Sequence, residues 1–235
     1  MISEIVEGWC RVNDMSVSSD QLLQFEKYAS LLKEWNEKMN LTAITDDEGI
    51  AVKHFIDSIS LLKFHSPKSG SRLIDIGTGA GFPGVPLKIM CPDIKLTLLD
   101  SLNKRLIFLD AVCKELNIEA ELIHARAEEG SRKNELRESF DIAVSRAVAN
   151  LPALCEYCIP YVKKGGLFIS MKGPDAGTEL KQAEKAVAVL GGKVGAVDTL
   201  ILPDESKRTI ISVLKVKQTP PAYPRRGQKI NKNPI

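Results

Sequence analysis

The chain has 235 residues, of which 44% are hydrophobic and 26% are charged. This composition excludes a disordered or collagen-like chain, and the length allows one or two domains whose core needs no cross-links. No run of about 18 apolar residues occurs, so a membrane-spanning helix is not expected. The first ten residues include Glu4 and Glu7 and lack the basic start of a secretory signal.

Five cysteines at irregular spacing indicate a reducing compartment, and we expect a cytoplasmic protein. Cys155 and Cys158 form the one C-x-x-C pair, and the chain has three histidines. A closed zinc site needs four ligands, which this sequence does not assemble, so no metal is expected. We interpret the two cysteines as small buried residues one helical turn apart.

The net charge of +2 is unevenly distributed. Residues 217–235 carry five cations and no acid, so the remainder, with 27 basic and 30 acidic side chains, has a net charge of −3. This asymmetry suggests a tail that binds a polyanion, although composition alone leaves a merely solubilising tail open. The tail also holds four prolines, so we expect it to be extended or disordered.

Residues 1–64 are predicted to form a helical extension, because apolar residues recur there at spacings of three and four. The second of its three helices is expected to begin after a cap at Ser18–Asp20. The third follows Thr45–Asp47. A stretch rich in turn-forming residues, 65–70, ends the extension.

Beyond residue 70, apolar strands alternate with helical stretches. Strands are predicted at Arg72–Ile76, Lys95–Leu99, Ala120–His124, Asp141–Ser145, Gly166–Met171, Val194–Leu202 and Thr209–Val216. Helices are predicted at Val85–Cys91, Asn103–Asn117, Leu151–Tyr161 and Thr178–Leu190. This alternation predicts an α/β fold, with a seven-stranded, mostly parallel sheet covered on both faces and an antiparallel final strand. The expected organisation is a helical extension (1–64), a catalytic domain (65–216) and a basic tail (217–235).

The most informative segment is the glycine-rich loop after the first strand, residues 75–84, which reads Asp-Ile-Gly-Thr-Gly-Ala-Gly-Phe-Pro-Gly. Glycines allow a sharp turn and a close approach of a ligand. The third glycine comes one place earlier than in the dinucleotide pattern G-x-G-x-x-G, where Phe82 stands, and no P-loop pattern occurs. Asp100 ends the second strand, where a carboxylate can accept hydrogen bonds from ribose hydroxyls. The pattern D-x-G-x-G-x-G resembles motif I of class I S-adenosylmethionine-dependent methyltransferases.

A more specific resemblance is carried by segments along nearly the whole chain. These are Lys53–Ser58, Gly79–Lys88, Asp100–Arg105, Arg126–Glu128, Ser145–Ala147 and Lys172–Gly173. In these segments the chain resembles the RsmG family, also called GidB. The resemblance implies a class I, Rossmann-like fold and methylation of N7 of one guanine in bacterial 16S ribosomal RNA. It implies S-adenosylmethionine as cofactor and the ribosomal RNA or the small ribosomal subunit as partner, and we expect a monomer. With these ligands, we expect removal of residues 220–235 to lower RNA affinity and to leave cofactor binding nearly unchanged.

The resemblance and the glycine loop together imply a set of cofactor-binding residues. These are Gly77, Gly79, Gly81, Phe82, Asp100, Ala127, Glu128 and Arg146. Glu128 is expected near the adenine, with a solvated charged surface as the alternative. Arg146 ends the fourth strand, where open α/β sheets bind ligands, and it can hold the cofactor carboxylate or a phosphate.

Candidates for positioning the RNA are His54, Asp57, Arg146, Lys172 and Arg208. His54 and Asp57 are three residues apart on one helix face, which the resemblance places beside the active site. A structural histidine and ordinary exposed cations remain the alternatives for His54, Lys172 and Arg208. No catalytic residue is assigned, because guanine N7 has an in-plane lone pair and loses no proton on attack. It needs alignment with the methyl group and no general base.

Other functions were weighed against this one. A methyltransferase for a small molecule is disfavoured by the basic tail, and one acting on another RNA remains open. A nicotinamide-dependent dehydrogenase is disfavoured by the spacing of the glycines. A non-catalytic RNA-binding module that senses the cofactor also remains open.

Overall fold

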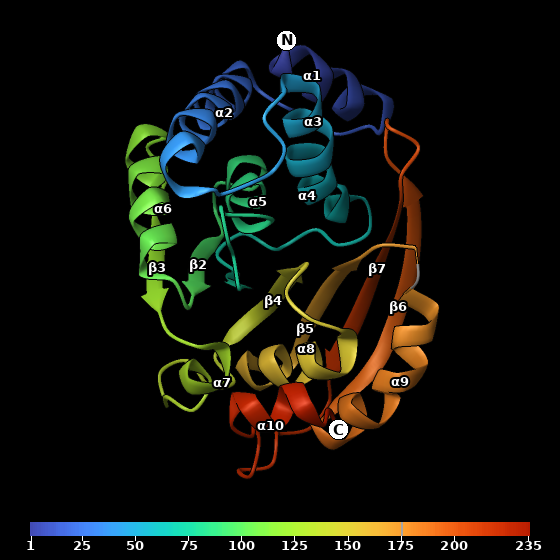
Figure 1. The fold of residues 1–235 in the computed structure, drawn as a ribbon. Helices are drawn as coiled ribbons and strands as arrows, with labels where there is room; N and C mark the ends of the chain where they lie inside the picture. Colours follow the sequence, from blue (N-terminus) through green and yellow to red (C-terminus); the bar gives the residue numbers. More distant parts are fainter. Residues whose placement is uncertain (175) are drawn as a thin grey trace.

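In the computed structural model, which describes residues 1–174 and 176–235, seven strands form one sheet between two layers of helices (Figure 1). The strands are β1 (Arg72–Ile76), β2 (Lys95–Asp100), β3 (Ala120–His124), β4 (Phe140–Arg146), β5 (Val162–Lys172), β6 (Gly192–Ile201) and β7 (Lys207–Lys215). Their order is β3-β2-β1-β4-β5-β7-β6. Among the described residues, β7 is the one strand that runs in the opposite direction to the other six, which confirms the predicted sheet.

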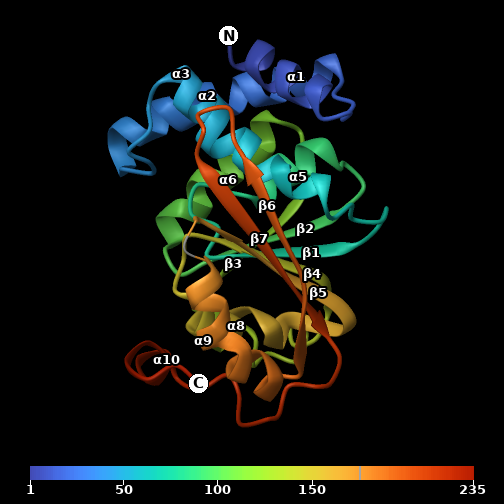
Figure 2. The same cartoon turned by 90° about the vertical axis from the view of Figure 1, so that its right-hand side faces the viewer.

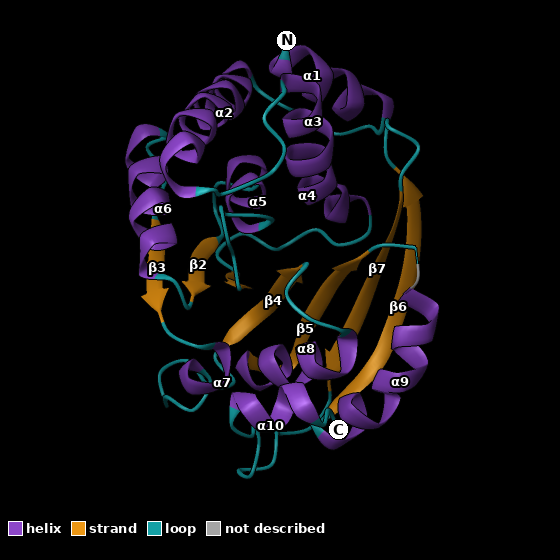
Figure 3. Ribbon diagram, viewed as in Figure 1, coloured by secondary structure: helices purple, strands orange, loops and turns teal. Residues whose placement is uncertain are grey.

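Helices cover both faces of the sheet, as Figure 3 shows. They are α1 (Ile2–Val12), α2 (Ser19–Met39), α3 (Asp47–Gly49), α4 (Asp57–Ile59), α5 (Gly84–Met90), α6 (Asn103–Glu115), α7 (Ala127–Gly130), α8 (Leu151–Cys158), α9 (Ala176–Val189) and α10 (Gly227–Lys232). Helices α1 to α6 lie on one face, whereas α7 to α10 lie on the other, so the two chain ends are far apart (Figure 2). No helix of the described residues is long and apolar enough to cross a membrane.

The hydrophobic core lies on both sides of the central strands. In β1 every residue after Arg72 is buried, as expected for a parallel strand covered on both faces. Alternate side chains of the strand serve opposite faces. Leu73 packs with the N-terminal helices, and Ile74 packs with α8 and α9.

The helical extension follows the prediction in its second helix and departs from it in the third. The side chain of Ser18 accepts a hydrogen bond from the backbone of Gln21, so the predicted cap is confirmed. One regular third helix was expected, but α3 and α4 are joined by a π-helical segment, Ile50–Ile56. The wider turn brings Ile50 and Phe55, which are five residues apart, into the core, where both are fully buried.

The expectation of a disordered tail is wrong, and the last part of the tail is helical and not extended. Residues 217–235 fold back along α8 and end in α10, at the bottom of Figure 1. Ile230 of α10 is fully buried, and Arg225 is paired with Glu156 of α8. Composition could not reveal this, because the carboxylate that neutralises the tail cation lies 69 residues earlier in the sequence.

Candidate active site

A pocket of about 340 Å³, the first pocket, lies at the carboxyl ends of β1 to β4. This is where open α/β sheets bind their ligands. Its lining comes from the ends of these strands, from α6 to α8 and from α10: Ile76, Gly77, Leu99, Asp100, Ser101, Arg105, Ala125, Arg126, Ala127, Glu128, Ala147, Val148, Ala149, Tyr157 and Asn231. Four of the predicted cofactor residues therefore meet here: Gly77, Asp100, Ala127 and Glu128.

The glycine loop shapes one wall of the first pocket. Gly77 has a φ of +69°, and a Cβ there would lie 2.6 Å from the side chain of Val148, so only glycine fits without strain. Under the loop, Asp75 Oδ2 accepts hydrogen bonds from Thr78 Oγ1 (2.7 Å) and from the Gly84 N–H (2.8 Å). Asp75 is fully buried, and this burial raises the pKa of its carboxyl to about 6.

Asp100, one of two acidic residues in the lining of this pocket, is 1% exposed. Its carboxylate accepts hydrogen bonds from the backbone N–H groups of Gly79 and Leu102, both at 2.9 Å. Arg105 Nη1 lies 3.2 Å from Asp100 Oδ2. The carboxylate is thus held rigidly at the pocket edge with its charge partly balanced, and it retains some acceptor capacity for a ligand hydroxyl.

A second pocket, of about 390 Å³, lies beside the first and shares Ala147 with it. Its lining comes from the helical extension, β4, β5 and β7: Ile44, Lys53, His54, Asp57, Arg146, Ala147, Met171, Lys172, Gly173 and Arg208. All five residues that were predicted to position the RNA therefore line one cavity.

In the second pocket, two cations pair with the single carboxylate of Asp57. It is 4% exposed, and it pairs with Arg146 Nη1 at 2.9 Å and with Arg208 Nε at 3.0 Å. Arg146 also donates to the backbone carbonyl of Lys53 at 3.1 Å. One carboxylate thus joins the helical extension to β4 and β7 and fixes both guanidinium groups at the pocket wall.

His54 lies flat against Phe82, with the ring centroids 4.5 Å apart and the planes 13° apart. Its Nε2 lies 2.8 Å from Thr42 Oγ1, and its buried Nδ1 has no hydrogen-bond partner among the described residues. Burial and the nearby Arg146 charge lower the pKa of His54 to about 4. The imidazole is therefore neutral at physiological pH.

Lys172 and Arg208 are not ordinary exposed cations. Lys172 Nζ pairs with Glu179 at 2.8 Å and donates to the carbonyl of Ala149 at 2.6 Å, with its side chain 10% exposed. The side chain of Arg208, which pairs with Asp57, is 22% exposed. Both cations are held in place by carboxylates and border the second pocket.

Several predicted cofactor residues do not line the first pocket. Phe82 is 7% exposed, and its ring packs between Tyr28 and His54. It therefore contacts the helical extension and does not line the first pocket. Gly81 packs under the hydroxyl of Tyr28, and Arg146 belongs to the second pocket. Gly79 takes part through its backbone N–H, which is bonded to Asp100.

Sequence reasoning missed Arg105, Tyr157 and Asn231, all of which line the first pocket. Arg105 was detectable, because it lies in the first turn of the helix that follows Asp100. Asn231 carried no local signal, since only the folding of the tail onto α8 brings it to the pocket.

The C-x-x-C pair has the predicted packing role. Cys155 and Cys158 are fully buried free thiols in the core. Burial raises the pKa of Cys155 to about 12, so its thiol is neither nucleophile nor ligand at neutral pH. The described residues contain no cluster of three or more histidine, cysteine or acidic side chains that could hold a metal ion.

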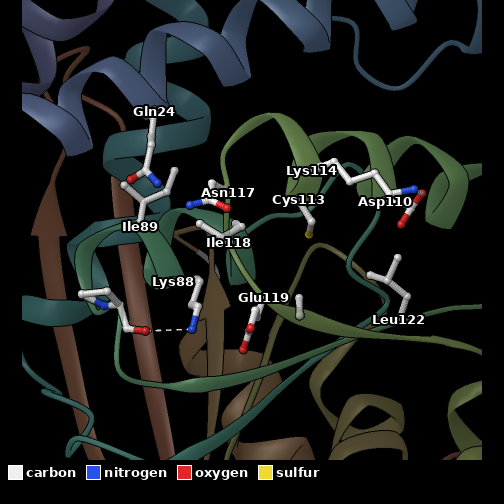
Figure 4. A pocket seen from close by; sticks show the side chains of 12 residues that line it. Gln24, Lys88, Ile89, Asp110, Cys113, Lys114, Asn117, Ile118, Glu119 and Leu122 are labelled. Carbon is white, nitrogen blue, oxygen red and sulfur yellow. Dashed lines mark hydrogen bonds and ion pairs between the residues drawn. The ribbon is translucent and has the colours of Figure 1, made fainter.

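A cavity of about 790 Å³ between α2, α5, α6 and the start of β3 is separate from both pockets (Figure 4). Its two cations, Lys88 and Lys114, have partners within the protein. Lys88 Nζ donates to the Pro92 carbonyl at 2.8 Å, and Lys114 pairs with Asp110 at 2.6 Å. The cavity also lies at the amino ends of the strands, away from the edge where both pockets open.

Comparison with known proteins gives consistent matches over this architecture. A model of the GidB family, described as rRNA small subunit methyltransferase G, matches residues 21–210. A relative from Lachnoclostridium phytofermentans, named ribosomal RNA small subunit methyltransferase G, is 52% identical over 235 residues, covering 99% of this chain and 97% of its own. A relative of the same name from Clostridium perfringens is 48% identical over 234 residues, covering 99% and 98%.

Solved structures of lower identity share the fold. The Methanococcus jannaschii fibrillarin pre-rRNA processing protein superposes with a TM-score of 0.55 at 14% identity, covering 69% of this chain and 77% of that one. Precorrin-6y C5,15-methyltransferase from Geobacter metallireducens superposes with a TM-score of 0.52 at 18% identity, covering 73% and 90%. Together with the strand order, these likenesses confirm the predicted Rossmann-like methyltransferase fold.

Proposed function

The chain belongs to the GidB family, the rRNA small subunit methyltransferases G, and on that premise we propose that it transfers a methyl group from S-adenosylmethionine to N7 of one guanine in bacterial 16S ribosomal RNA. The observation that carries the proposal is the pair of pockets that meet at Ala147. One has the glycine loop and acidic residue suited to the cofactor, and the other has the cations suited to RNA.

The first pocket fits S-adenosylmethionine, which supplies an electrophilic methyl group when bound. The backbone at Gly77 allows the ligand to approach closely, and Asp100 offers carboxylate oxygens to ribose hydroxyls. A ribose hydroxyl would compete with Arg105, whose side chain is 37% exposed and can move aside. Glu128 and Ala127, in the first turn of α7, would border the adenine.

The second pocket fits a guanine of the RNA. Guanine presents two adjacent acceptors, O6 and N7, and O6 can accept a hydrogen bond from a cation while N7 reacts. Arg146, Arg208 and Lys172 would supply such donors or contact the neighbouring phosphates. His54 is neutral and places no positive charge against the reacting nitrogen. The pocket therefore binds and orients the base, and no side chain needs to take a proton from N7.

The proposal includes a single chain working in the cytoplasm on the 16S RNA, free or within the small ribosomal subunit. The buried free thiols Cys155 and Cys158 support a reducing compartment.

The test uses ribosomal RNA and small subunits from a bacterial strain that lacks this protein. Incubation with the purified enzyme and S-adenosylmethionine should create one N7-methylguanine in the 16S RNA, mapped by chain cleavage at that base. Asp57→Asn should lower the rate at least tenfold, because it weakens the pairs that orient Arg146 and Arg208. Asp110→Asn, whose surface pair with Lys114 is remote from both pockets, is the matched control. If neither substrate gains N7-methylguanine, the proposal fails.

A further inference from the structure

The C-terminal tail is held to the body of the protein by buried ionic contacts. Glu156 of α8 is fully buried, and its carboxylate accepts three hydrogen bonds from Arg225: the backbone N–H at 2.6 Å, Nε at 3.0 Å and Nη2 at 2.7 Å. A buried carboxylate needs such a partner, because an unpaired buried charge is strongly destabilising. Arg225 is therefore fixed in place and not available to an outside ligand.

Another anchor lies nearer the start of the tail. Glu138 accepts from the Thr219 N–H at 2.7 Å and pairs with the buried Lys215 at 2.9 Å. Arg137 donates to the carbonyls of Thr219 at 2.9 Å and Tyr223 at 3.0 Å. The tail is thus fastened at both sides of its proline-containing stretch, and its path to α10 is defined.

These contacts place α10 beside the first pocket. Tyr157 Oη donates to Asn231 Oδ1 at 2.8 Å, and both residues line that pocket. Gly227, at the start of α10, lies so close to the carboxylate of Glu128 that a Cβ at this position would overlap it. The tail therefore borders the pocket beside Tyr157 and Glu128.

We propose that the tail is a permanent wall of the cofactor pocket and that Asn231 is a cofactor-binding residue, an inference that rests on the proposed function. With its Oδ1 bonded to Tyr157, the amide of Asn231 keeps two N–H donors for a ligand. The adenosyl group offers acceptors in its ring nitrogens and ribose oxygens. This assignment contradicts the sequence-based expectation that removal of the tail leaves cofactor binding unchanged.

The test measures binding of S-adenosylhomocysteine by calorimetry, in the absence of RNA. Asn231→Ala should weaken binding about 3- to 10-fold, the loss of one hydrogen bond. Tyr157→Phe should weaken it less, because it removes only the hydroxyl that holds Asn231. Lys232→Ala is the matched control, since Lys232 is exposed on the same helix and does not line the pocket. Deletion of residues 227–235 keeps the Arg225 anchor and should weaken binding more than Asn231→Ala.

Limited proteolysis gives an independent readout on the unmodified chain. Trypsin can cut after Arg226, Lys229 and Lys232, and S-adenosylhomocysteine should slow this cleavage at least threefold if the tail contacts the ligand. Equal affinities in all variants, or cleavage unaffected by the ligand, would overturn the inference while leaving the proposed function intact. A wild-type chain that fails to bind S-adenosylhomocysteine would overturn both. A chain that binds it and yet leaves the RNA unmethylated would overturn the proposed function alone.

Discussion

Asp100 connects the first pocket, where we propose that the cofactor binds, to the fold of the glycine loop. The carboxylate that faces the pocket also holds the N–H groups of Gly79 and Leu102. We predict that Asp100→Ala weakens S-adenosylmethionine binding by about 1–3 kcal/mol, because charge-assisted hydrogen bonds are lost. Calorimetry on the folded variant measures this, with Asp110→Ala, which removes a remote surface carboxylate, as the control. Unchanged affinity would remove Asp100 from the site.

His54 makes the stability of the protein depend on pH. Its pKa is about 4 in the folded protein and about 6.5 when unfolded, so between these values the unfolded chain binds the proton. The stabilisation by the neutral imidazole is complete above about pH 6.5 and is lost as the pH falls toward 4. We predict that the free energy of unfolding drops by about 2 kcal/mol more in the wild type than in His54→Gln between pH 7 and pH 5.

Urea denaturation of both proteins at the two pH values measures this difference. Asp75 titrates in the same range with the opposite effect, because its raised pKa favours the folded state as the pH falls. Its contribution is common to the wild type and the variant, and it cancels in the comparison. Equal drops in the two proteins would show that His54 is protonated without cost in the folded state.

At the scale of elements, the structure changes the role expected of the tail cations. Arg225 is committed to Glu156, whereas Arg226, Lys229 and Lys232 are exposed. We predict that replacing these three by alanine lowers RNA affinity and flattens the slope of log affinity against log salt by up to about 2, at roughly 0.7 per phosphate contact. Filter binding over a salt series measures the slope.

The control for the tail cations is the double substitution Lys27→Ala and Lys114→Ala, which removes two cations that already pair with acidic residues of the surface. Its slope should match that of the wild type. If the tail variant also matches the wild type, the tail acts only as a wall of the cofactor pocket. RNA binding would then rest on Lys172, Arg208 and the helical extension.

The elements that the sequence predicted well are those encoded locally. The strands Arg72–Ile76 and Ala120–His124 have the predicted bounds. The first is buried and is encoded by its own apolar residues, whereas the second is a half-exposed strand at the edge of the sheet. The π-helical segment and α10 could not be predicted in the same way. The first depends on core packing of residues five apart, and the second on the pairing of Arg225 with the distant Glu156.

The same distinction holds for the site. Gly77 follows β1, Asp100 ends β2, and both stand in recognisable local patterns, so their convergence followed from the parallel sheet. The grouping of Asp57 with Arg146 and Arg208 required three elements far apart in the chain. The placement of Phe82 depended on the helical extension, whose aromatic residues surround its ring.

For the whole molecule, the second pocket is complete only when the helical extension is docked on the sheet. Asp57 comes from the extension, and its partners Arg146 and Arg208 come from β4 and β7. The cofactor pocket likewise needs the tail for one wall. The ends of the chain therefore complete the two pockets, whereas the sheet supplies the edge on which they meet.

This arrangement leads to a prediction about the pH dependence of the reaction. Attack by guanine N7 releases no proton, so the reaction requires no proton acceptor in the second pocket. His54, with a pKa of about 4, stays neutral throughout the physiological range. Asp75, which is buried under the glycine loop, has a pKa raised to about 6. Above that range, single-turnover methyl transfer should therefore be nearly independent of pH, from about pH 7 to 9.

The measurement follows single-turnover methylation of the small subunit at saturating RNA and cofactor, so that the pH dependence of binding does not enter. His54→Gln should give the same flat profile, because the imidazole carries no charge in this window. A log-linear rise of the rate with pH in the wild type would report an essential base. Such a rise would contradict attack by the free lone pair of N7 and would favour an acceptor atom that must lose a proton.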